Sequence, residues 1–356
     1  MADIYINYGT NLQKMTMELM ETAKINEKIN PSMRIGIKPN LVVSRRAEEG
    51  ATTHPEIVEG IISYLQAQGC NDISIMEGSW VGDSTQSAFV NCGYTDLAHR
   101  YQVKLIDTKR DRVIRVKEGD ITLSLCESVV NVDYLINVPV LKGHCQTGMT
   151  CCIKNLKGCI PDSEKRRFHT MGLHKPIAAL GKALLPALHI VDSVCGDLSF
   201  EEGGNPVTAN RIMLGFDPVL LDSYGAGLIG FLPDEIEYLR LAKKEGSGKY
   251  ADETTTIVEL NAEHRPKVSL GHSGKMTKYR KMIEEDSACS ACYASLIYAL
   301  DKAGGRRNDI IKIGQGFQGK TLNGIGVGNC TAGCESYVKG CPPKASDIIA
   351  YLEKKG

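Results

Sequence analysis

The sequence predicts an α/β fold, with a mainly parallel sheet, flanking helices and a small C-terminal iron–sulfur domain. Short apolar runs typical of strands alternate with stretches of helical periodicity along most of the chain. Five of the thirteen cysteines lie after residue 276. We therefore expect residues 1–275 to form an α/β ligand-binding domain and residues 276–356 to form a cysteine-rich domain that binds a [4Fe–4S] cluster.

The expected strands are short runs rich in isoleucine, leucine and valine, and most are bounded by polar or glycine residues. In chain order they are 2–9, 34–42, 71–79, 103–108, 133–141, 187–194, 209–216, 256–260, 268–270 and 309–313.

The expected helices carry apolar residues three and four positions apart. The helix expected over 54–69 has Pro55 near its start and Gly69 at its end. A polar, glycine-containing stretch near Gly246 is expected to be a linker. The expected helices are 12–25, 54–69, 87–101, 218–230, 235–244, a helical stretch that begins near Met276, and 345–355.

Composition excludes several classes of partner. The formal net charge of the 356 residues is zero, which argues against nucleic acid and anionic membranes as partners recognised by bulk charge. No segment approaches the roughly 20 apolar residues that span a bilayer, and the first residues do not resemble a secretory signal. We therefore expect a cytoplasmic protein, in which thirteen cysteines favour metal or redox chemistry over disulfides.

The stretch GQGFQGKT at 314–321 matches the phosphate-binding P-loop pattern. A P-loop needs a strand before it and a helix after it. The strand at 309–313 fits, but glycines at 324, 326 and 328 disfavour a following helix. We expect a turn at 314–319, a flexible or extended segment after it, and no nucleotide hydrolysis.

The cysteines near the carboxyl end predict a metal site. Cys289 and Cys292 are three positions apart and can hold one metal centre, and later cysteines can complete it. We assign a [4Fe–4S] cluster to Cys289, Cys292, Cys330 and Cys341, although Cys334 could take the place of Cys330. A structural zinc ion or inert buried thiols are the alternatives.

A second group of cysteines has no spacing that matches a metal template, and small core residues, a labile second metal or a redox thiol remain open for it. This group is Cys145, Cys151, Cys152 and Cys159.

Polar residues that follow predicted strands indicate a ligand site, because ligands of α/β sheets bind beyond the carboxyl ends of the strands. Lysines there can bind carboxylates or phosphates, and histidines can carry protons. For catalysis we expect His144, Lys154 and His169. For binding of an anionic organic molecule we expect Lys38, Asn40, Lys142, Thr147, Asn155, Asp192 and Glu202.

These stretches resemble a known family. The runs KPNLV, THPEIVEGIISYL, VPVLKGHCQTGMTCCIKNLKGCIP, IVDSVCGDLSFEEGGNPV and DPVLLDSYGAGLIG are similar to the family called domain of unknown function 362, as far as about residue 232. The resemblance implies an association with iron–sulfur modules. A fainter similarity to nickel-pincer lactate racemases involves His144, Gly148, Lys154 and the turn 158–161. The chain lacks the glycine–glycine–arginine–lysine run of those enzymes.

Together these observations predict an iron–sulfur oxidoreductase that acts on a small anionic molecule and accepts a redox partner protein. Two alternatives remain open. One is a cluster-assisted lyase or isomerase, in which iron acts as a Lewis acid and needs an open coordination position. The other is an electron-transfer or scaffold protein without catalysis.

Overall fold

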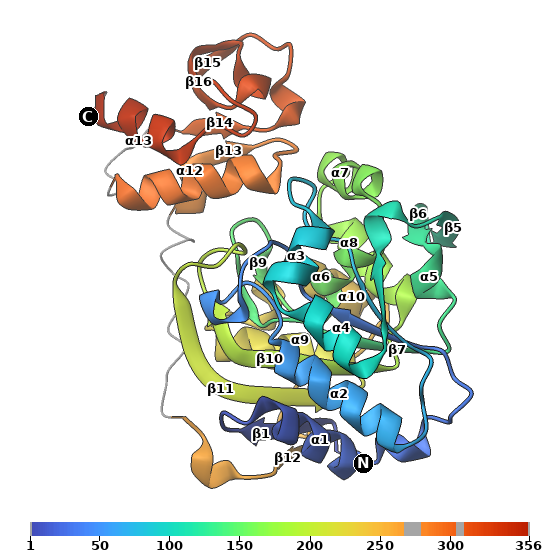
Figure 1. Cartoon of the computed structure of the whole chain (residues 1–356). Helices are drawn as coiled ribbons and strands as arrows, with labels where there is room; N and C mark the ends of the chain where they lie inside the picture. Colours follow the sequence, from blue (N-terminus) through green and yellow to red (C-terminus); the bar gives the residue numbers. More distant parts are fainter. Residues whose placement is uncertain (1, 267–278, 304–309, 355–356) are drawn as a thin grey trace. The chain divides into compact units, whose positions relative to one another are not determined.

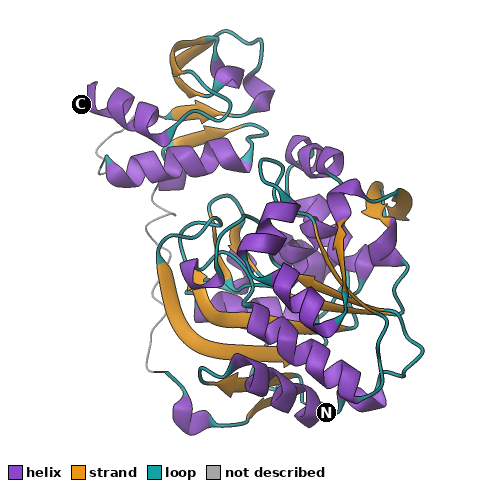
Figure 2. Ribbon diagram, viewed as in Figure 1, coloured by secondary structure: helices purple, strands orange, loops and turns teal. Residues whose placement is uncertain are grey.

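The computed structural model describes residues 2–266, 279–303 and 310–354. The chain forms two compact units. The first consists of Met1–Lys165 with His174–Gly271, and the second of Arg166–Leu173 with His272–Gly356. Figure 1 shows the course of the chain, and Figure 2 the distribution of helices and strands.

The first unit contains an eight-stranded sheet in the order β12-β1-β11-β10-β7-β2-β3-β4. Pairings of β11 with β1 and with β10 are antiparallel, and the other pairings of this sheet are parallel. The expected mainly parallel α/β sheet is therefore confirmed. Its strands are β1 Ile4–Tyr8, β2 Ile35–Pro39, β3 Ile73–Glu77, β4 Lys104–Asp107, β7 Tyr134–Val138, β10 Leu188–Asp197, β11 Pro206–Gly215 and β12 Ile257–Glu259.

Two sets of helices flank this sheet (Figure 1). In one set α1 packs on α2 and α2 on α4, and in the other α6 packs on α8 and α9 while α10 packs on α8. The first set is α1 Leu12–Thr22, α2 Pro55–Ala67, α3 Thr85–Asn91 and α4 Tyr94–Tyr101. The second set is α6 Cys152–Asn155, α8 His174–Leu184, α9 Pro218–Leu228 and α10 Glu237–Lys244.

The structure departs from the expected elements at a few places. The single helix expected over 87–101 is two helices, because Gly93 between them takes φ 81°, a left-handed conformation that ends α3. A strand expected at 268–270 lies outside the described residues. Elements that the sequence reading missed in this unit are β5 Val113–Glu118, β6 Ile121–Cys126, β8 Lys142–His144, β9 Gly148–Thr150, α5 Glu127–Val130 and α8. It also missed α7 Asp162–Thr170, whose residues from Arg166 onward belong to the second unit.

The second unit contains a four-stranded parallel sheet in the order β13-β14-β15-β16. The glycine-containing segment that we expected to be flexible or extended is the strand β15, which pairs with β14 and with β16. The elements are β13 Ile283–Glu285, α12 Ser290–Lys302, β14 Ile311–Ile313, β15 Leu322–Val327, β16 Cys334–Val338 and α13 Ala345–Lys354.

The P-loop pattern has no P-loop structure. A short 3₁₀ turn, Gln315–Phe317, follows β14, and the next element is the strand β15 instead of a helix. The loop closes around Asp286, since a Cβ added to Gly316 would lie 2.0 Å from the carboxylate oxygen Oδ1. Lys320 Nζ, the motif lysine, lies 3.6 Å from Asp286 Oδ2. The expected turn is confirmed, and an internal carboxylate lies inside it.

Candidate functional site

The buried polar residues of the first unit gather beyond the carboxyl ends of β2, β3 and β7, where parallel sheets place ligands. These residues form three groups, each built around an ion pair. One surrounds Lys38, one surrounds Glu201, and one joins His54 to Asp192.

Lys38 ends β2 and is completely buried. Its Nζ donates to Glu77 Oε2 at 2.9 Å, to the carbonyl of Pro39 at 2.6 Å and to Asn155 Oδ1 at 3.3 Å. Glu77 also accepts the backbone N–H groups of Leu41 and Gly78. Because every charged atom has a partner, this group is a closed ion pair.

Asn155 extends that group across the sheet. Its side-chain amide donates to Asn137 Oδ1 at 2.8 Å, and Asn137 Nδ2 lies 3.1 Å from His189 Nδ1. Burial lowers the pKa of His189 to about 3, so this imidazole is neutral. Its Nε2 is buried without a hydrogen-bond partner among the described residues. Lys38 and Asn155, both expected to bind substrate, make these contacts within the fold, and their role in binding stays a prediction.

Glu201 is the acidic centre of the second group. It lies in the loop between β10 and β11, and its carboxylate reaches two donors: His144 Nε2 at 2.9 Å and Lys154 Nζ at 2.6 Å. Lys142 Nζ donates to the backbone carbonyl of the same residue at 2.8 Å. Thus His144, Lys154 and Lys142, all expected at the anion site, do meet, and the residue that they contact is Glu201 of the same chain.

The protonation of His144 follows from its neighbours. Its Nδ1 lies 3.1 Å from the backbone nitrogens of Gln146 and Thr147 and accepts from both N–H groups. Burial lowers the pKa of His144 to about 4, although the nearby carboxylate of Glu201 acts in the opposite direction. The neutral ring therefore carries its proton on Nε2 and donates it toward the carboxylate. This arrangement favours a fixed hydrogen-bond donor over the proton carrier that we expected.

Lysines around this group differ in how they are paired. Lys142 donates to Ala51 O at 2.5 Å as well as to the loop carbonyl, and burial lowers its pKa to about 8. Lys154 also donates to Thr150 Oγ1 at 3.0 Å. Lys157 is partly buried and has no hydrogen bond or ion pair within the described part of the chain, and burial lowers its pKa to about 7. Lys157 is thus the least satisfied of the three.

The remaining predicted binding residues are buried or partly buried, and their role in binding stays a prediction. Asn40 accepts weakly from Lys142 at 3.4 Å, and its backbone N–H donates to Thr53. Thr147 donates its hydroxyl to Met149 O at 3.1 Å. Glu202 is partly buried, and burial raises its pKa, as does the adjacent charge of Glu201.

Asp192 belongs to the third group. Its Oδ2 lies 2.8 Å from both the backbone nitrogen and Nδ1 of His54, the residue before α2. Burial alone would lower the pKa of His54, but the charge of Asp192 and its hydrogen bond raise it to about 9. The pair is therefore an ion pair at neutral pH, and the expected contact of Asp192 with substrate stays a prediction.

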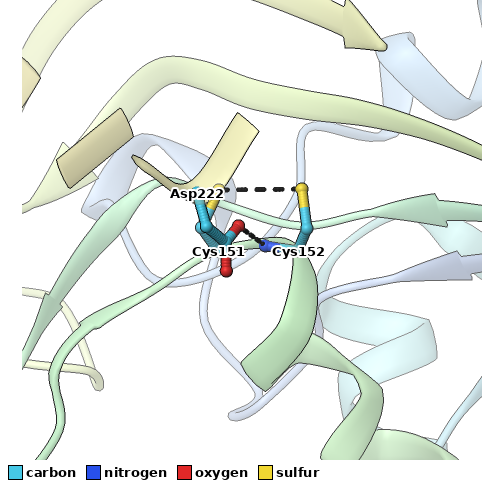
Figure 3. A group of neighbouring side chains, drawn as sticks. All are labelled: Cys151, Cys152 and Asp222. Atoms are coloured by element: carbon cyan, nitrogen blue, oxygen red, sulfur yellow. Dashed lines mark hydrogen bonds between the residues drawn. The ribbon is translucent and has the colours of Figure 1, made fainter. Parts of the chain in front are cut away.

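Cys151, Cys152 and Asp222 form the one group of three His, Cys, Asp or Glu side chains in the described ranges whose ligand atoms lie within 4.8 Å of one another (Figure 3). The carboxylate of Asp222 accepts the N–H groups of Cys152 at 2.6 Å and Ile153 at 3.2 Å, and the two sulfurs are 3.9 Å apart. Burial raises the pKa of Cys151 to about 11, so the thiol stays protonated. The contacts fix the start of α6, which carries Lys154.

In the second unit, three separate segments carry the predicted metal ligands. Cys289 precedes α12, and Cys292 lies in its first turn. Cys330 lies in the 3₁₀ turn Asn329–Thr331, and Cys341 follows β16. Burial raises the pKa of the Cys289 thiol, and the charges of Cys330 and Cys341 raise it further.

Cys334 differs from these four. It lies on β16, opposite Leu322, and burial raises the pKa of its thiol. The charged neighbours that act on it are Lys312, Glu284 and Glu335, and no cysteine is among them. This environment matches the expected role of a spare thiol, and the ligand assignment stays a prediction.

His169 lies on α7, in the segment that belongs to the second unit. Its Nδ1 is 3.1 Å from the carbonyl oxygen of Ala288, the residue before Cys289. His169 and the pair His144 and Lys154 thus belong to different units, and the shared catalytic site stays a prediction.

The sequence reading missed Glu201 and chose its neighbour Glu202. Two successive glutamates in the stretch SFEEGGNP offered a signal, but nothing in the spacing separates them. Glu77 carried a signal as well, since it lies near the end of the expected strand 71–79. Lys157 lies in the polar stretch that follows the expected strand 133–141.

The fold and site define a class: an α/β protein with a buried lysine, histidine and glutamate site at the carboxyl edge of its sheet. Residues 35–227 match the family model described as Domain of unknown function (DUF362). The chain belongs to this family, as its sequence resemblance indicated.

A curated relative is the thylakoid-associated protein sll1697 of Synechocystis sp., which is 26% identical over 205 residues. The match covers 56% of this chain and 62% of the relative, so less than two thirds of that protein is represented. No helix in the described residues is long and apolar enough to cross a membrane. The expected cytoplasmic location stays a prediction.

Two solved structures are similar. The lactate racemase apoprotein from Thermoanaerobacterium thermosaccharolyticum has a TM-score of 0.44 and 13% identity, over 65% of this chain and 57% of that one. A protein from Thermotoga maritima has a TM-score of 0.38 and 12% identity, over 69% and 62% of the two chains. The faint likeness to lactate racemases is thus found again, and at this level it assigns no activity.

Proposed function

We propose that this protein is an iron–sulfur oxidoreductase that holds one [4Fe–4S] cluster on Cys289, Cys292, Cys330 and Cys341. It acts on an anionic small molecule bound in the DUF362 domain. The observation that carries the proposal is the selective grouping of thiols in the second unit. Negative charge on Cys289, Cys341 or Cys330 would raise the pKa of Cys292 beyond the effect of burial, whereas no cysteine is among the neighbours that act on Cys334.

The surroundings of these thiols fit a cysteine-ligated cluster. Gln315 Nε2 donates to the sulfur of Cys289 at 3.3 Å, as an amide would toward a cluster thiolate. A Cβ added to Gly328 would lie 3.6 Å from the sulfur of Cys292, so the backbone passes close to that thiol. When bound, such a cluster supplies one-electron transfer.

The DUF362 domain contributes binding and proton handling. His144 offers a neutral Nε2–H donor, and Lys154 offers an ammonium, so together they orient an oxyanion. Lys157, whose pKa burial lowers to about 7, can release or accept a proton near neutral pH. A redox partner protein delivers or removes the electrons.

Metal analysis tests this proposal. After anaerobic purification we expect about four iron and four sulfide per chain, as the [4Fe–4S] composition requires. Cys341→Ser should lose most of both, and the matched control Cys334→Ser should retain them. Stoichiometric zinc without sulfide would show that the cluster assignment is wrong. Electron paramagnetic resonance can follow the oxidation state of the cluster while small oxyanions are added. If none of them changes that state, the result would favour an electron-transfer protein.

A further inference from the structure

The anion site of the first unit is filled by a side chain from a loop. His144 and Lys154 belong to β8 and α6, and their side chains are 1% and 3% exposed. Glu201, which bridges them, lies outside regular elements between β10 and β11, and its side chain is 15% exposed. The two donors His144 and Lys154 thus lie on regular elements of the domain, whereas the carboxylate of Glu201 that binds them comes from a loop.

The loop itself is held by contacts that do not involve the carboxylate of Glu201. Asp197, at the end of β10, accepts the backbone N–H groups of Ser199 at 2.7 Å, Phe200 at 3.0 Å and Asn205 at 2.9 Å. Gly203 takes φ 77°, and the N–H of Gly204 donates to Glu49 O at 2.9 Å. The loop can therefore keep its base while the side chain of Glu201 turns away from the two donors.

Replacing one carboxylate by another leaves the charge balance of the site unchanged. An empty receptor would bury the ammonium of Lys154 without a counter-charge, which costs several kcal/mol, and exchange of ligand for Glu201 avoids that state. The two donors determine which ligand can replace Glu201. His144 Nε2 lies 2.9 Å from one oxygen of the Glu201 carboxylate and Lys154 Nζ lies 2.6 Å from the other, so the site fits a carboxylate.

Lys157 adds a second requirement. It lies in the 3₁₀ turn Leu156–Cys159, directly after α6, and its charge acts on His144 to lower the pKa of that histidine. Its ammonium stays unpaired within the described residues even though Glu201 is in place. A guest with one carboxylate would leave Lys157 as it is, whereas a second acidic group would pair with it.

We propose that His144 and Lys154 form a carboxylate receptor that Glu201 occupies in the absence of ligand. The ligand is a small dicarboxylate, which displaces Glu201 with one carboxylate and pairs with Lys157 through the other. The proposal rests on the proposed function in so far as it names the substrate class of that same site. Binding itself requires neither the cluster nor electron transfer.

Calorimetry on the full chain tests the first part, with acetate, malonate, succinate and glutarate as probes and phosphate and chloride as comparisons. Glu201→Gln removes the internal competitor, so we expect the preferred dicarboxylate to bind at least 10-fold more tightly than to the unaltered protein. The control Glu48→Gln changes an exposed glutamate of the neighbouring turn Ala47–Glu49 and should leave the affinity unchanged. Glu201→Ala should lower the melting temperature, and acetate should restore it saturably.

Lys157→Met in the Glu201→Gln background tests the second part. We expect the preference for the dicarboxylate over acetate to fall from at least 10-fold to less than 3-fold. Equal binding of acetate and all dicarboxylates before this change would refute the role of Lys157. Tighter binding of phosphate than of every dicarboxylate would refute the ligand class.

The unaltered protein offers a readout that does not depend on variants. Hydrogen exchange should become faster in the loop 198–205 when the preferred dicarboxylate is added, and slower around 142–157. If Glu201→Gln gains no affinity and the loop exchange does not change, Glu201 is a permanent structural partner and the proposal is wrong. Iron content measured in the same samples separates the two proposals, because binding without a cluster refutes only the proposed redox function.

Discussion

Two buried lysines of the first unit have the same chemistry but different kinds of partner. Lys38 pairs with Glu77, and both residues lie at the ends of neighbouring parallel strands, β2 and β3. Lys154 pairs with Glu201, which reaches the site from a loop. The strand pair is fixed by the sheet, whereas the loop pair depends on a segment outside regular elements. The comparison indicates which lysine can exchange its partner for a ligand.

Gly158 shows how tightly the strand pair is enclosed. A Cβ added there would lie 2.0 Å from Glu77 Oε1 and 2.7 Å from Lys38 Nζ, so only glycine leaves space for the two side chains. Glu201 is less enclosed, since its side chain is 15% exposed while that of Glu77 is 3% exposed. Lys38 is therefore enclosed within the fold, and we place the proposed ligand site around Lys154.

The largest effect is expected from removing one member of the enclosed pair. Glu77→Ala would leave the ammonium of Lys38 buried without a counter-charge, and we expect a loss of about 3–5 kcal/mol in the free energy of unfolding. Glu201→Ala should cost less, because the side chain of Glu201 is 15% exposed whereas that of Glu77 is 3% exposed. Urea denaturation measures both. Equal losses in the two variants would contradict the distinction between a fixed and an exchangeable pair.

The ion pair of His54 and Asp192 extends the comparison to pH. The pKa of His54 is raised to about 9, above its usual value of roughly 6.5. Protonation is therefore favoured by folding: the stabilisation is fully present below about pH 6.5 and is lost as the pH rises through 9. We expect a contribution on the order of 3 kcal/mol to disappear over this range.

Asp192→Asn is the matched variant for this measurement, because it keeps the shape and removes the charge. The difference in unfolding free energy between the two proteins should shrink from pH 6 to pH 9.5. A difference that stays constant over this range would mean that His54 is neutral in the folded protein. Taking the difference also cancels other buried groups, such as Lys142, that titrate near pH 8.

The smallest effect is expected from the exposed pair of Lys320 and Asp286 in the second unit. Their side chains are 57% and 43% exposed and their charged atoms are 3.6 Å apart, so Lys320→Ala should change the unfolding free energy by about 0.5 kcal/mol or less. Neither the unaltered protein nor Lys320→Ala should bind ATP, because the strand β15 follows the glycine-containing loop instead of a helix. Tight, magnesium-dependent ATP binding that Lys320→Ala abolishes would overturn this interpretation of the motif.

Local patterns in the sequence predicted the strands of the large sheet, most of the long helices and the mainly parallel character of the sheet. They also indicated that polar residues such as Lys142, His144 and Lys154 gather at one edge of it, because the carboxyl ends of parallel strands meet there. The cysteine spacing indicated a metal site and selected four ligands, which metal analysis can test. Each of these inferences depends on residues that are close in sequence or on a general rule of parallel sheets.

Only the tertiary structure decided which charges pair. Lys154 and Glu201 are 47 positions apart, and His54 and Asp192 are 138 positions apart, so no local pattern connects them. Glu201 and Glu202 are indistinguishable by composition, yet the path of one loop directs the first carboxylate to two donors and leaves the second with a raised pKa. Burial and partner are properties of the folded chain, and they separate a lysine that stabilises the fold from one that can bind a ligand.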